Sequence, residues 1–107
     1  MTTFDERERA AEGKFVHDEE IMFRAHARRD TKLGQWAASL MGMAAADAAG
    51  YAESLVSSGI SSADEGSVST RVVQDLAKAG IVKSEAEITA KMGELLAVAL
   101  AEIKASG

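Results

Sequence analysis

The sequence predicts an all-α protein, a compact four-helix bundle with a flexible, charged N-terminal arm leading into a long first helix. Proline is absent from the 107 residues and apolar residues make up 47% of them, so the chain contains no strong helix breaker of that kind. After about residue 20, apolar residues recur at spacings of three and four, the period of an amphipathic helix. We expect a disordered arm over 1–18 and a bundle over 19–107, with helices over about 19–42, 44–58, 63–79 and 84–105.

The last predicted helix, 84–105, has the clearest pattern. Ser84 and Glu87 have the spacing of a capping box, in which each side chain accepts a hydrogen bond from the backbone N–H of the other residue. Lys104 carries the charge that suits a helix C-terminus. One apolar face is formed by Ile88, Met92, Leu95, Leu96, Ala99 and Ile103.

The helix predicted over 63–79 has a shorter apolar stripe of Val68, Val72, Leu76 and Ala79. Ser62 and Glu65 repeat the capping-box spacing at its start. Each of the last two helices follows a Gly-Ile pair, at 59–60 and at 80–81. We expect the glycine of each pair to adopt the left-handed conformation that ends a helix, with the isoleucine packing back onto that helix.

The first two helices have smaller apolar residues. Trp36 is expected to be the largest core anchor, and the alanines of the second helix should let it approach its neighbours closely. The first stripe contains Leu33, Trp36, Ala37 and Leu40, and the second contains Ala44, Ala48, Tyr51, Ala52 and Leu55.

Charge and composition exclude several classes of function. The net charge is −5 and the pI is about 5.0, which argues against nucleic-acid binding, because phosphate contacts need an excess of Lys and Arg. The absence of cysteine removes disulfides and thiolate chemistry. No apolar run is long enough to span a membrane, and no signal peptide is recognisable. We therefore expect a soluble, cytoplasmic protein without direct membrane insertion.

No motif indicates catalysis, so we predict that the protein is not an enzyme. The sequence lacks a glycine-rich phosphate loop, a dinucleotide fingerprint and a paired nucleophile motif. His17 and His26 are nine residues apart, on opposite sides of a continuous helix, and could not hold one metal ion. We predict no metal site and no required cofactor; weak adenine-nucleotide binding stays open, although no motif supports it.

The first helix carries the only basic cluster, which we call the basic ridge: Arg24, Arg28, Arg29 and Lys32. Glu20 precedes Arg24 by four residues, the favourable orientation for a helical ion pair. The ridge is either a solvated helix face that balances the acids before it or a docking site for an acidic partner.

The arm presents two phenylalanines among charged residues. In helical conformation Phe4, Ala11, Phe15 and Met22 fall within about 20° of one line and form a seam one side chain wide. Burying two rings contributes roughly 2–3 kcal/mol each, which does not offset the backbone entropy of ordering some fifteen residues. The arm is therefore either a segment that folds on a partner or a solubilising tail.

Three stretches together resemble a known family, the zeta subunit that inhibits the rotary ATP synthase of alphaproteobacteria. The resemblance is strongest at residues 4–40 and 88–103, and its most distinctive residues are in the arm, from Phe4 to Asp18. The stretches are FDERERAAEGKFVHDEE at 4–20, ARRDTKLGQWAA at 27–38 and EITAKMGELLAVALAEI at 87–103.

The resemblance implies a function and a partner. The arm would wedge into a catalytic interface of the soluble catalytic head and stop ATP hydrolysis, and the protein would be peripheral to the inner face of the membrane when bound. The alternative is a small helical regulator that binds a nucleotide or an acidic partner through the basic ridge. The implied partner-binding residues are Phe4, Asp5, Arg7, Glu8, Arg9, Glu12, Lys14, Phe15, His17, Asp18, Arg24, Arg28 and Arg29.

Overall fold

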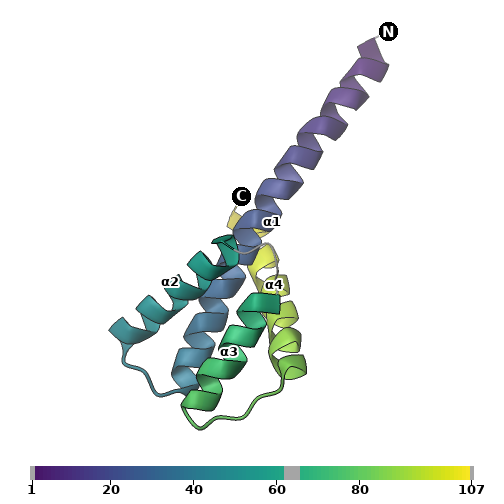
Figure 1. The fold of residues 1–107 in the computed structure, drawn as a ribbon. Helices are drawn as coiled ribbons and strands as arrows, with labels where there is room; N and C mark the ends of the chain where they lie inside the picture. The colour runs from purple at the N-terminus through teal and green to yellow at the C-terminus, as the bar shows by residue number, and fades with distance from the viewer. Residues whose placement is uncertain (1, 62–65, 107) are drawn as a thin grey trace.

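Over the residues whose backbone the structure describes, 2–61 and 66–106, the chain forms four α-helices and no strand (Figure 1). The structure is a computed structural model, and its side chains are described over 19–60 and 66–105. The helices are α1 (Thr2–Leu40), α2 (Ala45–Ser61), α3 (Gly66–Lys78) and α4 (Glu85–Ser106). The predicted all-α, four-helix fold is confirmed.

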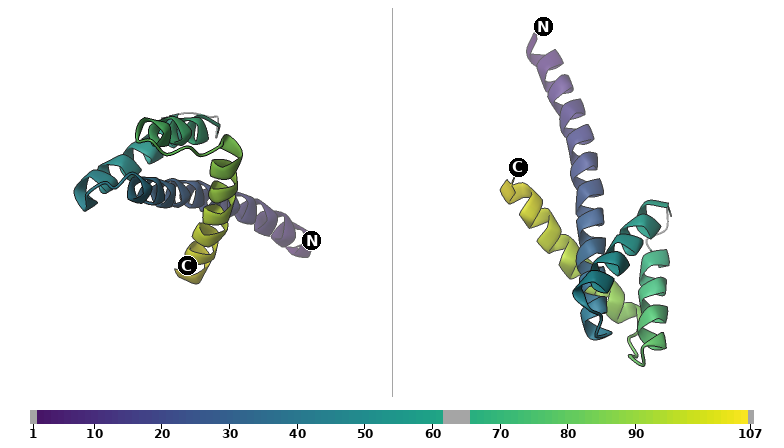
Figure 2. Two further views of the ribbon diagram at one scale, coloured as in Figure 1. Left: turned by 90° about the horizontal axis from the view of Figure 1, so that it is seen from below. Right: turned by 90° about the vertical axis from the view of Figure 1, so that its left-hand side faces the viewer.

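α1 is the axis of the fold, and its N-terminal part extends beyond the other helices (Figures 1 and 2). α2 and α4 pack against its C-terminal part, and α3 packs mainly against those two. At 1.5 Å per residue, the 39 residues of α1 span about 58 Å, which accounts for most of the 65 Å length of the molecule.

The first helix begins at Thr2 and not near residue 19 as expected. The added residues include several Glu, Arg and Ala, which favour helix, and they extend a helix already nucleated within the bundle. The backbone of the arm is therefore a continuation of α1. The flexibility predicted for residues 1–18 concerns motion in solution and stays a prediction.

The core combines one buried stripe from each helix. Its largest fully buried side chains are Leu33 from α1, Leu55 from α2, Val68, Val72 and Leu76 from α3, and Ile88 from α4. The predicted stripes are confirmed at these positions. Leu40, Ala44 and Ala79 are exposed instead, because each lies at or just beyond the end of a helix.

Trp36 is not the central anchor that the sequence predicts. It is half-buried and packs against the edge of the core, with Lys91 Nζ 5.4 Å from its ring centroid. A position at the edge suits an indole, which combines an apolar ring with an N–H that needs a polar partner. Leu33 and Leu55 occupy the centre.

Three helix ends have standard capping geometry, and two of them, at Gly80 and at Ser84, were predicted. Gly80 has a φ of 82°, and the N–H of Ile81 donates to the Leu76 carbonyl at 2.9 Å, which is the Schellman arrangement. Gly42 ends α1 in the same way, with a φ of 73°. At the start of α4 the N–H of Glu87 donates to Ser84 Oγ at 3.1 Å, and the N–H of Ser84 donates to Glu87 Oε1 at 3.4 Å. The predicted box at 62 and 65 lies outside the described residues.

The prediction for Gly59 is wrong. α2 continues through this residue to Ser61, and within the described backbone only Gly42 and Gly80 have a positive φ. The structure gives a different reason for glycine here: a Cβ on residue 59 would lie 2.5 Å from Oδ2 of Asp30 on α1. Gly59 thus allows α2 to pass a buried carboxylate.

Gly34 allows a close approach between α1 and α2. A Cβ on this residue would lie 2.5 Å from Ala52 Cα and 2.9 Å from Ala52 Cβ. Ala52 itself is buried. Small residues on both helices therefore set their separation, as the alanine-rich second helix predicts.

A polar cluster, the α2–α3 clasp, joins those two helices through Tyr51, Ser54, Ser58, Arg71 and Asp75. Arg71 Nη1 donates to the Ser54 carbonyl at 3.0 Å and to Ser58 Oγ at 2.7 Å, and Nη2 donates to Ser54 Oγ at 2.7 Å. Tyr51 donates to Asp75 Oδ2 at 2.8 Å, and burial together with this bond raises the pKa of Tyr51. The phenol therefore remains a neutral donor at physiological pH.

Arg71→Met is expected to lower the free energy of unfolding by about 1–3 kcal/mol, because charged hydrogen bonds are lost while the aliphatic stem remains. The midpoint of urea unfolding measures this loss. Lys83→Met is the matched control, since Lys83 forms only a surface ion pair with Glu87 at 3.7 Å, worth about 0–1 kcal/mol. Equal losses of stability in both variants would mean that the α2–α3 clasp contributes no more than an ordinary surface ion pair.

Candidate partner-binding surface

The predicted binding residues from Phe4 to Asp18 all lie on the part of α1 that extends beyond the bundle (Figure 1). Their side chains lie outside the described ones, so their individual roles stay predictions. The described part of α1 shows where packing begins. Ala25 is fully buried, whereas Met22 and Phe23 are 40% and 61% exposed. Ile21 is partly buried, so among the described side chains the bundle begins to cover α1 between Ile21 and Ala25.

The end of the predicted apolar seam is uncovered in the structure. Met22 is the last member of the seam, and Leu33, in the centre of the core, lies eleven residues later on the same helix. Eleven residues amount to about three turns, so Met22 and Leu33 lie within about 20° of one line. The seam thus continues the core-facing stripe of α1 to Met22, where the stripe is exposed.

The basic ridge is divided among different environments. Arg24 donates to Glu20 Oε1 at 2.6 Å, and both side chains are exposed, which confirms the predicted ion pair. Pairs of this kind contribute only about 0.3–0.5 kcal/mol. Arg24 can therefore exchange Glu20 for another carboxylate at little cost.

Arg28 and Lys32 contact the last turn of α4. Lys32 Nζ lies 3.0 Å from Glu102 Oε1 and 3.2 Å from Oε2, and Arg28 Nη1 lies 3.6 Å from Oε1. All three side chains are partly exposed. The hydrogen bond from Lys32 and the charges of Lys32 and Arg28 hold the pKa of Glu102 below its usual value. Glu102 is therefore ionised at neutral pH.

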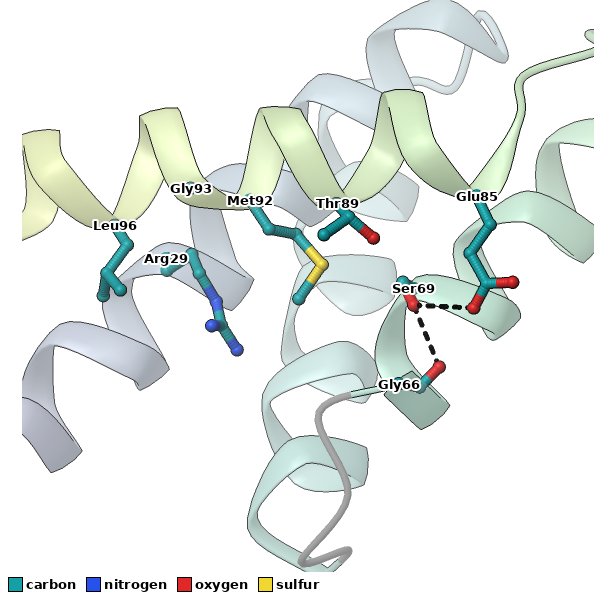
Figure 3. A pocket seen from close by; sticks show the side chains of 8 residues that line it. All are labelled: Arg29, Gly66, Ser69, Glu85, Thr89, Met92, Gly93 and Leu96. Atoms are coloured by element: carbon teal, nitrogen blue, oxygen red, sulfur yellow. Dashed lines mark hydrogen bonds between the residues drawn. The ribbon is translucent and has the colours of Figure 1, made fainter.

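Arg29 points into the bundle and not along the ridge. It is 4% exposed, and its Nη2 lies 3.0 Å from Oδ1 of the equally buried Asp30. Figure 3 shows its side chain directed into a pocket of about 310 Å³ between α1, α3 and α4. There Ser69 Oγ lies 3.4 Å from Glu85 Oε1. In this structure Arg29 is paired inside the bundle, and a direct contact with a partner stays a prediction.

Helix geometry contains the signal that separates Arg29 from the other basic residues. Arg24, Arg28 and Lys32 follow one another in steps of four, whereas Arg29 precedes the core residue Leu33 by four and shares its side of the helix. Glu102 was missed altogether. Its partner Lys32 is 70 positions away, so no local spacing could reveal the contact.

Neither a metal ion nor a cofactor is indicated by the described side chains. No group of three or more His, Asp or Glu residues in that part of the chain could hold a metal. His26 is half-buried on α1, and His17 lies outside the described side chains. Nucleotide binding through the basic ridge stays a prediction, now confined to the exposed Arg24 and the partly exposed Arg28 and Lys32.

Comparison with known protein families gives a match along almost the whole chain. A family model described as ATPase inhibitor subunit zeta matches residues 1–102, from the arm to Glu102. No curated protein matches the chain at a significant level. Within the described residues, none of the helices has the length and apolar character needed to cross a membrane.

Proposed function

The chain belongs to the ATPase inhibitor subunit zeta family, as the resemblance of residues 4–40 and 88–103 predicted, and we propose that it inhibits ATP hydrolysis by the rotary ATP synthase. The N-terminal part of α1 inserts into a catalytic interface of the soluble head. The helical bundle remains outside the interface. The protein itself performs no chemistry, and it acts in the cytoplasm at the inner face of the membrane.

The observation that carries this proposal is a pair of adjacent exposed apolar side chains on α1. Met22 and Phe23 are uncovered one turn before Ala25 enters the bundle, on a helix that continues away from the other three. Exposed apolar residues in a row indicate a binding surface, because water solvates them poorly. The predicted seam residues Phe4 and Phe15 would extend that surface along the arm.

The proposed mechanism is steric. The catalytic sites of the head must interconvert during hydrolysis, and an inserted helix blocks one interface from changing shape. Inhibition requires the arm to bind one conformational state of the head more tightly than the others, since a ligand that binds all states equally shifts none. Phe4 and Phe15 supply apolar burial, while Arg24 and Arg28 continue the contact through charge.

Removing residues 1–18 tests the function and the site together. The full chain is expected to inhibit ATP hydrolysis by purified head, and residues 19–107 alone are expected to lose inhibition while keeping the bundle, because the described core residues, from Ala25 onward, all remain. Circular dichroism checks that the truncated chain remains folded. Inhibition by neither protein rejects the function, and equal inhibition by both shows that the arm is not the wedge.

A further inference from the structure

The contact of Glu102 with Arg28 and Lys32 has a feature that a purely stabilising contact does not require. The two cations belong to the face of α1 that continues toward the arm, and they lie one helical turn apart. Both remain partly exposed, so a carboxylate from outside can reach them. In the free protein, however, a carboxylate from α4 already occupies them.

We propose that Glu102 is an internal competitor for the Arg28–Lys32 pair. In the free protein Glu102 of α4 binds these two cations, and in the complex a carboxylate of the partner binds them instead. The inference rests on the proposed function in naming the partner as an acidic surface of the synthase head. Arg28 and Lys32 are then a carboxylate-binding site, and Glu102 limits how tightly that site binds.

The charges in the contact explain why competition is the expected role. Glu102 is kept ionised by the two cations, so it competes at every pH at which the partner's carboxylates are also charged. It is attached to the same chain, so its effective concentration beside Arg28 and Lys32 is high. The contact is partly exposed and weak enough to exchange. Docking therefore replaces Glu102 without unfolding the bundle.

Glu102→Gln tests the competition in the full chain. It is expected to lower the concentration needed for half-inhibition by about two- to fivefold, the factor that corresponds to an exposed ion pair. The advantage should shrink as salt rises to about 0.5 M, because salt screens exposed charges. The matched control is Glu94→Gln, which removes the same charge from α4, where Glu94 pairs with Lys91 at 3.6 Å.

A second comparison separates competition from a general loss of negative charge. Glu102→Gln should bring no gain in a chain that already carries Arg28→Gln and Lys32→Gln, because the contested site is then absent. A gain that persists in that background overturns the proposal. So does inhibition by Glu102→Gln that is equal to or weaker than that of Glu94→Gln, since Glu102 would then be irrelevant or would orient the two cations for the partner.

A measurement without the synthase keeps the two proposals distinguishable. Binding of a fluorescein-labelled decaglutamate peptide, followed by anisotropy, probes the cationic site alone. Tighter binding to Glu102→Gln than to Glu94→Gln supports the competition, and equal binding rejects it. Failure of the wild-type chain to inhibit the head rejects the proposed function, while the peptide result still decides the role of Glu102.

Discussion

Gly34→Ala is expected to lower the free energy of unfolding by about 1–3 kcal/mol, the range for overpacking a tight contact. Alanine is the better helix former by about 1 kcal/mol, so propensity alone predicts the opposite sign. The added Cβ would lie 2.5 Å from the Cα of Ala52, and a backbone atom cannot move aside as a flexible side chain does. α1 and α2 must separate, and the core contacts around Leu33 and Leu55 loosen with them. Thermal unfolding should show a midpoint lower by roughly 4–8 °C per kcal/mol.

Gly50→Ala makes the same chemical change where space is free. Gly50 lies within α2, and a Cβ there meets no atom within 4 Å. This variant should therefore gain about 0.5–1 kcal/mol from helix propensity. Opposite signs for the two variants would assign the loss at Gly34 to the helix crossing. Stabilisation by both would mean that α1 and α2 can separate freely at this point.

The sequence predicts the fold best where local chemistry determines it. The capping box of Ser84 and Glu87 places the start of α4 within one residue, and the glycine rule identifies the turn at Gly80. The same rule fails at Gly59, because the reason for that glycine is Asp30, a neighbour brought close only by the tertiary fold. The prediction for Trp36 fails for a similar reason, since side-chain size does not reveal which residue of an apolar stripe lies at the centre of the core.

The candidate surface is predictable to a similar degree. Helical spacing pairs Glu20 with Arg24, and this ion pair is present in the structure. The same spacing assigns Met22 to the seam, whose other members lie outside the described side chains. Spacing also groups Arg29 with the ridge, although its direction is toward the core. The role of Glu102 depends on the packing of α4 against α1. That packing follows from the whole core and not from any short pattern, so only the structure could reveal the contact.

Phe4→Ala combined with Phe15→Ala is expected to weaken inhibition of the head by roughly a thousandfold or more. If each ring contributes roughly 2–3 kcal/mol on burial in the interface, losing both costs about 4–6 kcal/mol, and each 1.4 kcal/mol is a factor of ten in affinity. Alanine preserves the helix propensity of the arm, so the change removes burial and not helix formation. The stability of the bundle should be unchanged, because the described core residues begin at Ala25, beyond both substitutions. Inhibition titrations with purified head measure the first effect, and thermal unfolding the second.

Glu6→Ala combined with His17→Ala is the matched control for the two rings. Glu6 and His17 are eleven residues apart, as Phe4 and Phe15 are, but helical geometry places them about 140–160° from the seam. A single seam facing the partner requires this pair to cost much less inhibition than the two phenylalanines, although the resemblance implies that His17 also binds the partner. Comparable losses of inhibition from both pairs of substitutions would mean that the partner encloses the arm on all sides. If neither pair of substitutions weakens inhibition, the seam is not part of the interface. The contact would then have to depend on charge, and inhibition would be strongly sensitive to salt.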